Sequence, residues 1–417
     1  MSRAASTDPV PPGSVIGILG GGQLGRMTAL AARSMGYRVH VLDPDPSCAA
    51  APVVERVIAA PFDDARAAAT LARGVSVVTL EIEKIAPAAL AAAEEHAPLR
   101  PGPGVLHVVQ DRVRQKRWLS ERGFPTGPFR EVTSESEFVA AVEEFAGRVF
   151  AKSSFGGYDG RGQAQLDEDA GGGHRQALLA GTEAGTEAPA ARRAAAARAA
   201  WRAVGEGPCV VEEALPLEAE LSVLVARGVD GRDVAYPPAR NHHVDRILDW
   251  SQLPGGFDPP LVERAHELAR GIASALGVVG LVCVELFLTK DGRLLVNELA
   301  PRPHNSYHGS EASCPTGQFE QLVRAACALP LGAVEPARPT AIANLLGELW
   351  GGDEPPDFAA ALEVPGVRLS LYGKGEPRPG RKMGHLVAVA ETPDAALARV
   401  REGRARLGHG ARKPFSV

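Results

Sequence analysis

The chain has 417 residues, of which 45% are hydrophobic and 23% charged, an ordinary balance for a globular protein of two or three domains. Its net charge of −5 includes no basic block, which argues against nucleic-acid binding. The five cysteines form no CxxC pair, so we expect neither a zinc ribbon nor a disulfide framework. A membrane span needs about 18 consecutive apolar residues, and no segment has them, so we expect a cytoplasmic protein.

The first part of the chain alternates strands and helices. After an expected disordered leader over residues 1–13, short apolar runs predict strands at 14–19, 38–42 and 75–80. A helix follows the glycines at 20–25 and ends near Gly36. This order predicts a Rossmann-like parallel sheet over residues 14–110.

The rest of the chain predicts two further domains. The segment 111–215 holds a helix that begins at Asp111, a strand at 149–152 and a strand at 210–215. We interpret its Ala- and Gly-rich stretch, 170–205, as a surface insertion with a helix at 190–204. Residues 216–417 contain strands around a helix at 260–276 and paired strands over 367–389. The predicted class is α/β (α+β) with three domains.

A glycine motif near the N-terminus permits two interpretations. Gly20, Gly22 and Gly25 satisfy GxGxxG after a strand, and Asp43 follows at a distance typical of dinucleotide-binding proteins. A nicotinamide-dependent oxidoreductase is therefore one alternative. A tight turn, or a phosphate site for a mononucleotide, needs the same glycines.

The segment 151–163, AKSSFGGYDGRGQ, predicts ATP binding. Lys152 ends a strand and delivers a fixed positive charge, and the glycines after it allow backbone N–H groups to surround phosphate oxygens. Tyr158, Asp159 and Arg161 are available to contact a second substrate. The Walker sequence GxxxxGK[ST] is absent, so this site is of another type.

The segment 281–301 predicts a hairpin that pairs two carboxylates. With Asp291 and Gly292 as a two-residue turn, Lys290 faces Arg293 and Glu285 faces Glu298. Like charges placed opposite each other destabilise a sheet unless a cation lies between them. Paired oxygen ligands suit Mg²⁺ on substrate phosphates.

Six motifs in this order resemble the N5-carboxyaminoimidazole ribonucleotide synthetases, which are ATP-grasp ligases: GGGQLGRM, TLEIE, DRVRQK, GGYDGRGQ, VNELAPRPHNS and RPGRKMGH. The resemblance covers about residues 14–390. It implies the ATP-grasp fold and the carboxylation of aminoimidazole ribonucleotide by ATP and bicarbonate through carboxyphosphate. It also implies a homodimer, a separate mutase that takes the product, and no biotin. Other ATP-grasp ligases, such as a formate-dependent purine transformylase or a biotin carboxylase, remain alternatives.

The resemblance also assigns residues to ATP and magnesium. Arg112 and Lys152 would bind phosphates, and one or two Mg²⁺ ions would lie on Glu285 and Glu298 beside Asn297. Glu220 would bind the ribose, and His243 matches a histidine of the nucleotide site. The lid would comprise Gly157, Tyr158, Asp159, Gly160, Arg161, Gly162 and Gln163, and the adenine edge Glu212, Glu213, Ala214 and Leu215.

For the other two substrates, the resemblance points to the C-terminal part. Arg302, His304 and Asn305 would form the pocket for bicarbonate and carboxyphosphate. The ribonucleotide would contact Tyr158, Asp159 and Arg161, with its 5′-phosphate held by Lys374, Arg381 and Lys382.

Three positions depart from the family pattern. Tyr307 replaces the glycine of HNSGH, and we expect it to crowd the acceptor pocket. Gly317 stands where serine is usual, and Val323 stands near a position where histidine is common. We expect these changes to alter the start of a helix near the site.

Overall fold

The computed structural model describes residues 7–145, 147–155, 162–167, 189–351 and 355–408. The chain forms two compact units, which are described separately. Unit 1 comprises Met1–His107, Ala219–Leu286 and Leu299–Val417, and unit 2 comprises Val108–Glu218 and Phe287–Glu298. The predicted division into three domains stays a proposal.

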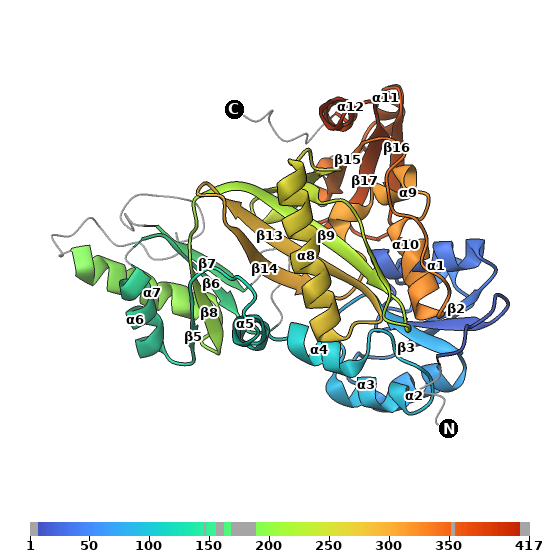
Figure 1. Cartoon of the computed structure of the whole chain (residues 1–417), viewed down its shortest axis with the longest axis horizontal. Helices are drawn as coiled ribbons and strands as arrows, with labels where there is room; N and C mark the ends of the chain where they lie inside the picture. The colour runs from blue at the N-terminus through green and yellow to red at the C-terminus, as the bar shows by residue number, and fades with distance from the viewer. Residues whose placement is uncertain (1–6, 146, 156–161, 168–188, 352–354, 409–417) are drawn as a thin grey trace. The chain divides into compact units, whose positions relative to one another are not determined.

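Unit 1 begins with the predicted parallel sheet. Its strand order is β3-β2-β1-β4, and each neighbouring pair is parallel. The strands are β1 (Val15–Leu19), β2 (Arg38–Asp43), β3 (Arg56–Ala59) and β4 (Val77–Leu80), and the helices are α1 (Gln23–Ser34), α2 (Ala65–Arg73), α3 (Pro87–Glu94) and α4 (Pro103–Val109, which crosses into unit 2). The helices α2 and α3 lie side by side (Figure 1). The sequence did not predict β3, a strand of only four residues with partly exposed side chains.

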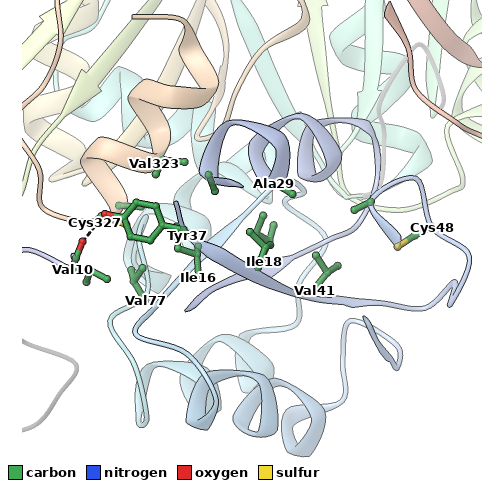
Figure 2. Packing of buried hydrophobic residues seen from close by; sticks show 14 residues of the cluster. Val10, Ile16, Ile18, Ala29, Tyr37, Val41, Cys48, Val77, Val323 and Cys327 are labelled. Carbon is green, nitrogen blue, oxygen red and sulfur yellow. Dashed lines mark hydrogen bonds between the residues drawn. The ribbon is translucent and has the colours of Figure 1, made fainter. Parts of the chain in front are cut away.

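The segment before β1 is ordered from Thr7 onward and joins the core of this sheet, so the predicted disordered leader is wrong for residues 7–13. Val10 is buried, its N–H donates to the carbonyl of Cys327 at 2.8 Å, and its carbonyl accepts from the hydroxyl of Tyr37 at 2.6 Å. Figure 2 shows Val10 beside Tyr37 and Cys327 in a cluster with Ile16 and Val77. Residues 1–6 lie outside the described residues.

A second, nine-stranded sheet has the order β14-β13-β9-β11-β12-β15-β17-β16, with β10 paired to β9. Its strands are β9 (Leu217–Arg227), β10 (Asp233–Ala235), β11 (Ala239–Val244), β12 (Ile247–Leu253), β13 (Gly280–Thr289), β14 (Leu294–Ala300), β15 (Thr340–Leu346), β16 (Val367–Leu371) and β17 (Lys382–Val389). The helices are α8 (Pro259–Leu276), α9 (Ser310–Ser313), α10 (Gln318–Ala326), α11 (Phe358–Leu362) and α12 (Pro393–Ala405). The predicted helix near 260–276 is confirmed, and it begins at Asp258, whose side chain accepts from the N–H of Leu261.

Unit 2 holds a small antiparallel sheet of order β5-β8-β6-β7. Its strands are β5 (Phe129–Val132), β6 (Val149–Ser153), β7 (Gln163–Leu166) and β8 (Cys209–Glu213), and its helices are α5 (Arg112–Glu121), α6 (Glu135–Phe145) and α7 (Pro189–Ala203). Figure 1 shows α6 and α7 side by side against this sheet.

The helix α7 corrects one interpretation of the sequence. Its side chains Ala197 and Trp201 are buried against Phe138 in the core of unit 2. The part of the Ala- and Gly-rich stretch that the structure describes is therefore a structural helix and not a surface insertion. Residues 168–188 of the stretch lie outside the described residues.

The hairpin turn between β13 and β14 differs from the prediction. The N–H of Thr289 donates to the carbonyl of Arg293 at 3.0 Å, and the N–H of Gly292 donates to the carbonyl of Thr289 at 2.8 Å. The loop therefore has three residues, and its third, Gly292, takes the left-handed φ of 79°. Thr289 and not Lys290 faces Arg293. The predicted register, in which Glu285 faces Glu298, assumed the shorter turn and therefore no longer follows.

Within the described parts of the chain, none of the helices is both long enough and apolar enough to cross a membrane.

Candidate functional site

A pocket in unit 2 gathers cationic and acidic side chains from one helix and three strands. It is lined by Arg112, Gln115, Lys116, Lys152, Val210, Glu212, Asn297 and Glu298. The sheet register explains part of this set. Lys152 on β6 pairs with Val210 on β8, and Phe150 pairs with Glu212, so Lys152 and Glu212 project from the same face.

Glu212 lies between two lysines. One of its oxygens is 2.6 Å from Nζ of Lys116, and the other is 2.6 Å from Nζ of Lys152. Burial alone would raise the pKa of Glu212, but the two ammonium groups outweigh it and hold the pKa at about 2. Burial lowers the pKa of Lys116, and Glu212 opposes that effect. The charge of Lys116 therefore depends on its contact with Glu212.

The sequence did not predict three residues of the pocket, Gln115, Lys116 and Val210, and of these only Lys116 is charged. The signal was present, because Arg112 and Lys116 stand four residues apart and so share one face of α5. The helix begins where predicted, since the side chain of Asp111 accepts from the N–H of Arg114 and from the hydroxyl of Ser154. This cap holds the start of α5 against the end of β6.

The strand β14 brings two predicted residues, Asn297 and Glu298, to the pocket. Nη2 of Arg112 is 3.4 Å from Oε2 of Glu298, and Nζ of Lys152 donates to Oδ1 of Asn297 at 3.2 Å. Five predicted residues, Arg112, Lys152, Glu212, Asn297 and Glu298, therefore meet with Lys116 in one place.

The predicted lid is described only at its C-terminal end. Gly162 has a φ of 63°, and its carbonyl accepts from the N–H of Ser153 at 2.8 Å. Gln163 begins β7 and pairs with Lys152. The predicted residues Gly157, Tyr158, Asp159, Gly160 and Arg161 lie outside the described residues.

The predicted adenine segment follows directly from the pocket. Glu212 directs its carboxylate to the two lysines, whereas Glu213 is exposed. The N–H of Ala214 donates to the carbonyl of Arg148 at 2.9 Å, which fixes the chain before Leu215. The segment thus continues the chain from β8 beyond the lysine pocket.

Unit 1 holds two acid–histidine pairs, each formed by two of the predicted site residues. Nδ1 of His243 on β11 lies 2.6 Å from Oε2 of Glu220 on β9. Burial lowers the pKa of His243, but the contact with Glu220 outweighs it, and the net shift is upward. In the second pair, Nε2 of His304 is 2.9 Å from Oε1 of Glu285 on β13.

Arg302 and Asn305 flank His304 in the turn after β14. Nε of Arg302 is 2.7 Å from Oε1 of Glu83, which follows β4. Asn305 is 7% exposed, and within the described residues neither polar atom of its amide has a hydrogen-bond partner. A buried amide without partners costs free energy unless a ligand or water satisfies it, so this turn is suited to binding a small polar ligand.

The turn between β16 and β17 carries the predicted phosphate-binding cations. Nζ of Lys374 donates to Oε1 of Gln23, the first residue of α1, at 2.6 Å. Arg381 closes the turn, with its guanidinium on the carbonyl of Glu376 at 2.8 Å. Lys382 begins β17.

The glycine motif is occupied by the protein's own side chain. The carboxylate of Glu81 accepts from the N–H groups of Gly22 at 2.7 Å and of Leu24 and Gly25 at 3.0 Å. A Cβ at Gly20 would lie 2.6 Å from Cγ of Glu81. The glycines therefore make room for Glu81, which fills the place a dinucleotide pyrophosphate would take at the start of α1.

Asp43 is engaged in the same way, because it accepts from the N–H groups of Gly21 and Asp45 at 2.7 and 2.9 Å. The nicotinamide alternative is thus contradicted by the loop that suggested it.

Tyr307 points into the core. It is fully buried, and its hydroxyl donates to the carbonyl of Ser222 at 2.6 Å and lies 3.0 Å from that of Pro237. Its ring meets that of Tyr236 edge to face at 5.6 Å. The expectation that Tyr307 crowds the acceptor pocket is wrong, because the 3-10 turn Asn305–Tyr307 directs this side chain into the hydrophobic cluster instead.

Gly317 has a related explanation. A Cβ at this position would lie 2.3 Å from Oε1 of Glu311, whose carboxylate accepts from the N–H of Phe319 at the start of α10. Glu311 thus supplies the cap that a serine at 317 would otherwise give. Val323 is buried in the hydrophobic core between α10 and the first sheet, so its role is packing.

Three family models match consecutive parts of the chain. They describe a ribonucleotide synthetase preATP-grasp domain at residues 14–110, an ATP-grasp domain at 117–319 and a phosphoribosylaminoimidazole carboxylase C-terminal domain at 340–399.

Relatives and solved structures agree with these matches. The N5-carboxyaminoimidazole ribonucleotide synthase of Brucella melitensis is 38% identical over 378 residues, which cover 91% of this chain and 97% of the relative. An N5-carboxyaminoimidazole ribonucleotide synthetase solved as its ADP complex is 36% identical, with a TM-score of 0.83 over 95% of this chain and 98% of that one. The enzyme of Aspergillus clavatus, solved with ADP and 5-aminoimidazole ribonucleotide, is 26% identical with a TM-score of 0.80 over 94% and 98%. The chain therefore belongs to the N5-carboxyaminoimidazole ribonucleotide synthase family of ATP-grasp ligases.

Proposed function

We propose that this chain carboxylates 5-aminoimidazole ribonucleotide to N5-carboxyaminoimidazole ribonucleotide in purine biosynthesis, with ATP and bicarbonate as co-substrates. Family membership supports the overall reaction. The observation that carries the nucleotide part is the convergence of Arg112, Lys116 and Lys152 beside Glu298 in one pocket. Three cations there suit the phosphates of a nucleotide.

In this proposal, Arg112, Lys116 and Lys152 neutralise the phosphate oxygens of ATP. Glu212 forms ion pairs with both lysines and fixes their positions. Glu213, Ala214 and Leu215 lie along the adenine, and the Glu220–His243 pair lies at the ribose. The segment Gly157–Gln163 acts as the lid, which keeps water from a reactive acyl phosphate.

We keep Glu285 and Glu298 as the proposed magnesium ligands because of the chemistry of their donor atoms, and not because of the hairpin register, which the observed turn does not support. Glu285 and Glu298 supply the hard carboxylate oxygens that Mg²⁺ prefers, and the side chain of Glu298 is 36% exposed. Among the described residues, no group of three or more His, Cys, Asp or Glu side chains forms a ready metal cage. An ion shared with substrate phosphates needs no such cage. When bound, Mg²⁺ neutralises charge on the transferred phosphoryl group.

The acceptor pocket would comprise Arg302, His304 and Asn305. The buried amide of Asn305 without a partner supports a polar ligand here. A bicarbonate oxygen attacks the γ-phosphorus of ATP, and the bond to ADP breaks. The amine of the ribonucleotide then attacks the carbon of carboxyphosphate, the bond to phosphate breaks, and the amine loses a proton. Charge stabilisation by positioned donors accounts for both steps without a nucleophilic side chain.

The ribonucleotide itself would contact Tyr158, Asp159 and Arg161 under the lid. Lys374, Arg381 and Lys382 would hold its 5′-phosphate. The contact of Lys374 with Gln23 supports this assignment, because it holds the ammonium group in place at one end of the turn. A homodimer, a cytoplasmic location and a separate mutase that receives the product stay predictions.

The reaction is tested by ADP release from purified protein with Mg-ATP and aminoimidazole ribonucleotide. We expect release that requires both bicarbonate and the ribonucleotide. Release that requires formate instead would favour a transformylase, and release that ignores the ribonucleotide would favour another carboxylase.

The pocket is tested by Glu298→Gln, which keeps the size of the side chain and removes its charge. We expect turnover to fall by at least about 10²-fold, as for loss of one electrostatic contact to a transition state. Circular dichroism should match the unmodified protein. Turnover near the unmodified level would contradict the assignment of Glu298.

A further inference from the structure

The turn that carries the proposed acceptor residues is bound by one side chain of the helix α10. Oε1 of Gln318, the first residue of α10, accepts from the N–H of His304 at 2.8 Å, and Nε2 of Gln318 donates to the carbonyl of His304 at 3.0 Å. Gln318 is fully buried. A main-chain N–H only donates and a carbonyl only accepts, so these two contacts fix which end of the amide is oxygen and which is nitrogen.

The two contacts hold the main chain of His304 on both sides of its Cα. The residue is extended, with a φ of −120° and a ψ of 144°, so its N–H and its carbonyl point to the same side, as in a hydrogen-bonded pair of antiparallel strands. The amide of Gln318 takes the place of the neighbouring strand. It fixes the two peptide planes that set φ and ψ, which are the only soft dihedrals of the backbone. The direction of the His304 side chain, and of the peptide that leads to Asn305, therefore depends on Gln318.

The turn in its own part fixes Gln318. The N–H of Gln318 donates to the hydroxyl of Ser310 at 3.0 Å, and that hydroxyl donates to the carbonyl of Tyr307 at 2.6 Å. Nε2 of Gln318 also lies 3.0 Å from Nδ1 of His308. Nδ1 accepts this bond, which agrees with the burial that holds the pKa of His308 well below its ordinary value. The start of α10 and the turn therefore exchange hydrogen bonds in both directions.

A second glutamine on the same helix makes the same pair of contacts elsewhere. Oε1 of Gln321 accepts from the N–H of Gly332 at 2.9 Å, and Nε2 of Gln321 donates to the carbonyl of Gly332 at 2.9 Å. Gln321 is also fully buried. Gly332 lies in the connection between α10 and β15 and is assigned to no substrate. The two glutamines therefore have equal chemistry and burial, and they differ in the segment that they hold.

We propose that Gln318 is a positioning residue for the acceptor pocket. Its side chain holds the main chain of His304 and so orients the side chains of His304 and Asn305 before substrates bind. Loss of such a contact affects the rate through geometry, and a displacement of about 1 Å can lower it by about 10²-fold. The inference rests on the proposed function in one respect, that the turn with His304 and Asn305 receives bicarbonate and carboxyphosphate.

The first test is amide hydrogen exchange, measured by NMR on the full chain without any substrate. The variants are Gln318→Met and, as a matched control, Gln321→Met, because methionine keeps the unbranched shape and lacks the amide. In Gln318→Met, we expect the N–H of His304 to exchange at least about tenfold faster and the N–H of Gly332 to be unchanged. In Gln321→Met, the two effects should be reversed. Equal exchange of the His304 N–H in both variants would overturn the proposal.

The second test is the kinetics of ADP release with aminoimidazole ribonucleotide, at varied bicarbonate and at varied ATP. In Gln318→Met, kcat/KM for bicarbonate should fall by about 10²-fold. The KM for ATP should stay within about twofold, because the cationic pocket proposed for its phosphates lies in unit 2. Gln321→Met removes an equally buried amide and should keep both constants of the unmodified protein. The same fall of kcat/KM for bicarbonate in both variants would assign Gln318 a structural role only.

A third variant, Gln318→Glu, decides the question if Gln318→Met does not fold. Glutamate keeps the length of the side chain and an acceptor for the N–H of His304, but it places a second oxygen against the carbonyl of His304. We expect kcat/KM for bicarbonate between those of the unmodified protein and Gln318→Met, and a value equal to that of the unmodified protein would refute the positioning role. If the unmodified protein does not release ADP with the ribonucleotide and bicarbonate, the proposed function fails, and the exchange experiment still decides whether Gln318 holds His304.

Discussion

Tyr307 shows how a single residue can depart from a family pattern without entering the site. The position follows His304 by three residues, and the backbone there turns through a 3-10 helix. The side chain of Tyr307 therefore points into the hydrophobic core, where its hydroxyl contacts the main-chain carbonyls of Ser222 and Pro237.

Replacing Tyr307 by phenylalanine should then affect stability and leave activity unchanged. Loss of the buried hydroxyl should lower the free energy of unfolding by about 1–3 kcal/mol, because the carbonyl of Ser222 loses its donor. Urea denaturation measures the free energy of unfolding. The KM for the ribonucleotide should stay within about twofold of that of the unmodified protein. A large rise in that KM would place the side chain at the pocket after all.

Glu212 is the residue on which the charge balance of unit 2 depends. Its carboxylate is 2.6 Å from two lysines, and the side chains of all three residues are at most 14% exposed. Removing one member of a buried charged group leaves the others uncompensated.

We expect Glu212→Gln to lower the free energy of unfolding by about 3–5 kcal/mol in the absence of nucleotide. Glu144→Gln is a fitting control, because Glu144 pairs with Arg130 on the surface of the same unit with half of its side chain exposed. That control should cost less than about 1 kcal/mol. Equal effects of the two variants would show that the lysines do not depend on Glu212.

At the scale of elements, α10 begins in an unusual way. Gly317 precedes it without a capping side chain, and the buried Glu311 accepts from the N–H of Phe319. Burial raises the pKa of Glu311 from its ordinary value of 4.5 to about 7, and the N–H of Phe319 opposes this only in part.

This shift predicts a pH dependence of stability. A carboxyl whose pKa is higher in the folded state stabilises the fold below pH 4.5, and this contribution is lost as the pH rises through about 7. The variant Glu311→Gln cannot ionise at this position. The difference between its free energy of unfolding and that of the unmodified protein should therefore shift in favour of the variant by about 3 kcal/mol between pH 4.5 and 8. Denaturation curves across this range measure the difference, and the exposed Glu363→Gln should show none. A constant difference would contradict the buried state of Glu311.

The helices and strands near the site illustrate what local patterns predict. Asp111 marks a helix start in the sequence, and the structure confirms it, because a capping side chain acts within a few residues. The helix predicted at 260–276 begins one residue earlier, at Pro259, after the capping side chain of Asp258. The turn at Asp291 and Gly292 was predicted one residue too short. Two- and three-residue hairpin loops share the same glycine signal, and the hydroxyl of Thr289, which bonds to the N–H of Arg293, favours the longer loop here.

At the scale of the molecule, the last helix is fixed to the large sheet by one buried ion pair. Arg404 on α12 donates through both of its terminal nitrogens to Asp249 on β12, at 2.8 and 3.0 Å, and Asp249 is 2% exposed. The two residues are 155 positions apart in the chain.

Asp249→Asn should lower the free energy of unfolding by about 3–5 kcal/mol, because the guanidinium loses its counter-charge in a buried position. The same helix offers a control in Glu402, which pairs with Arg406 on the surface. Glu402→Gln should change stability by less than about 0.5 kcal/mol. If both variants cost the same small amount in thermal and urea denaturation, the ion pair does not hold the helix.

The sequence by itself determined the ATP-grasp class, the position of the lysine that we propose to bind the nucleotide, and much of the order of the elements, because these depend on short motifs and on periodicity along the chain. Only the tertiary structure decided which partners the side chains meet. Glu81 fills the glycine loop from 56 residues away, Val10 packs in a core with Cys327, and Ser306 shares a hydrogen bond with Ser222, 84 residues earlier in the chain. Such contacts depend on how separate segments pack together, which no local pattern records.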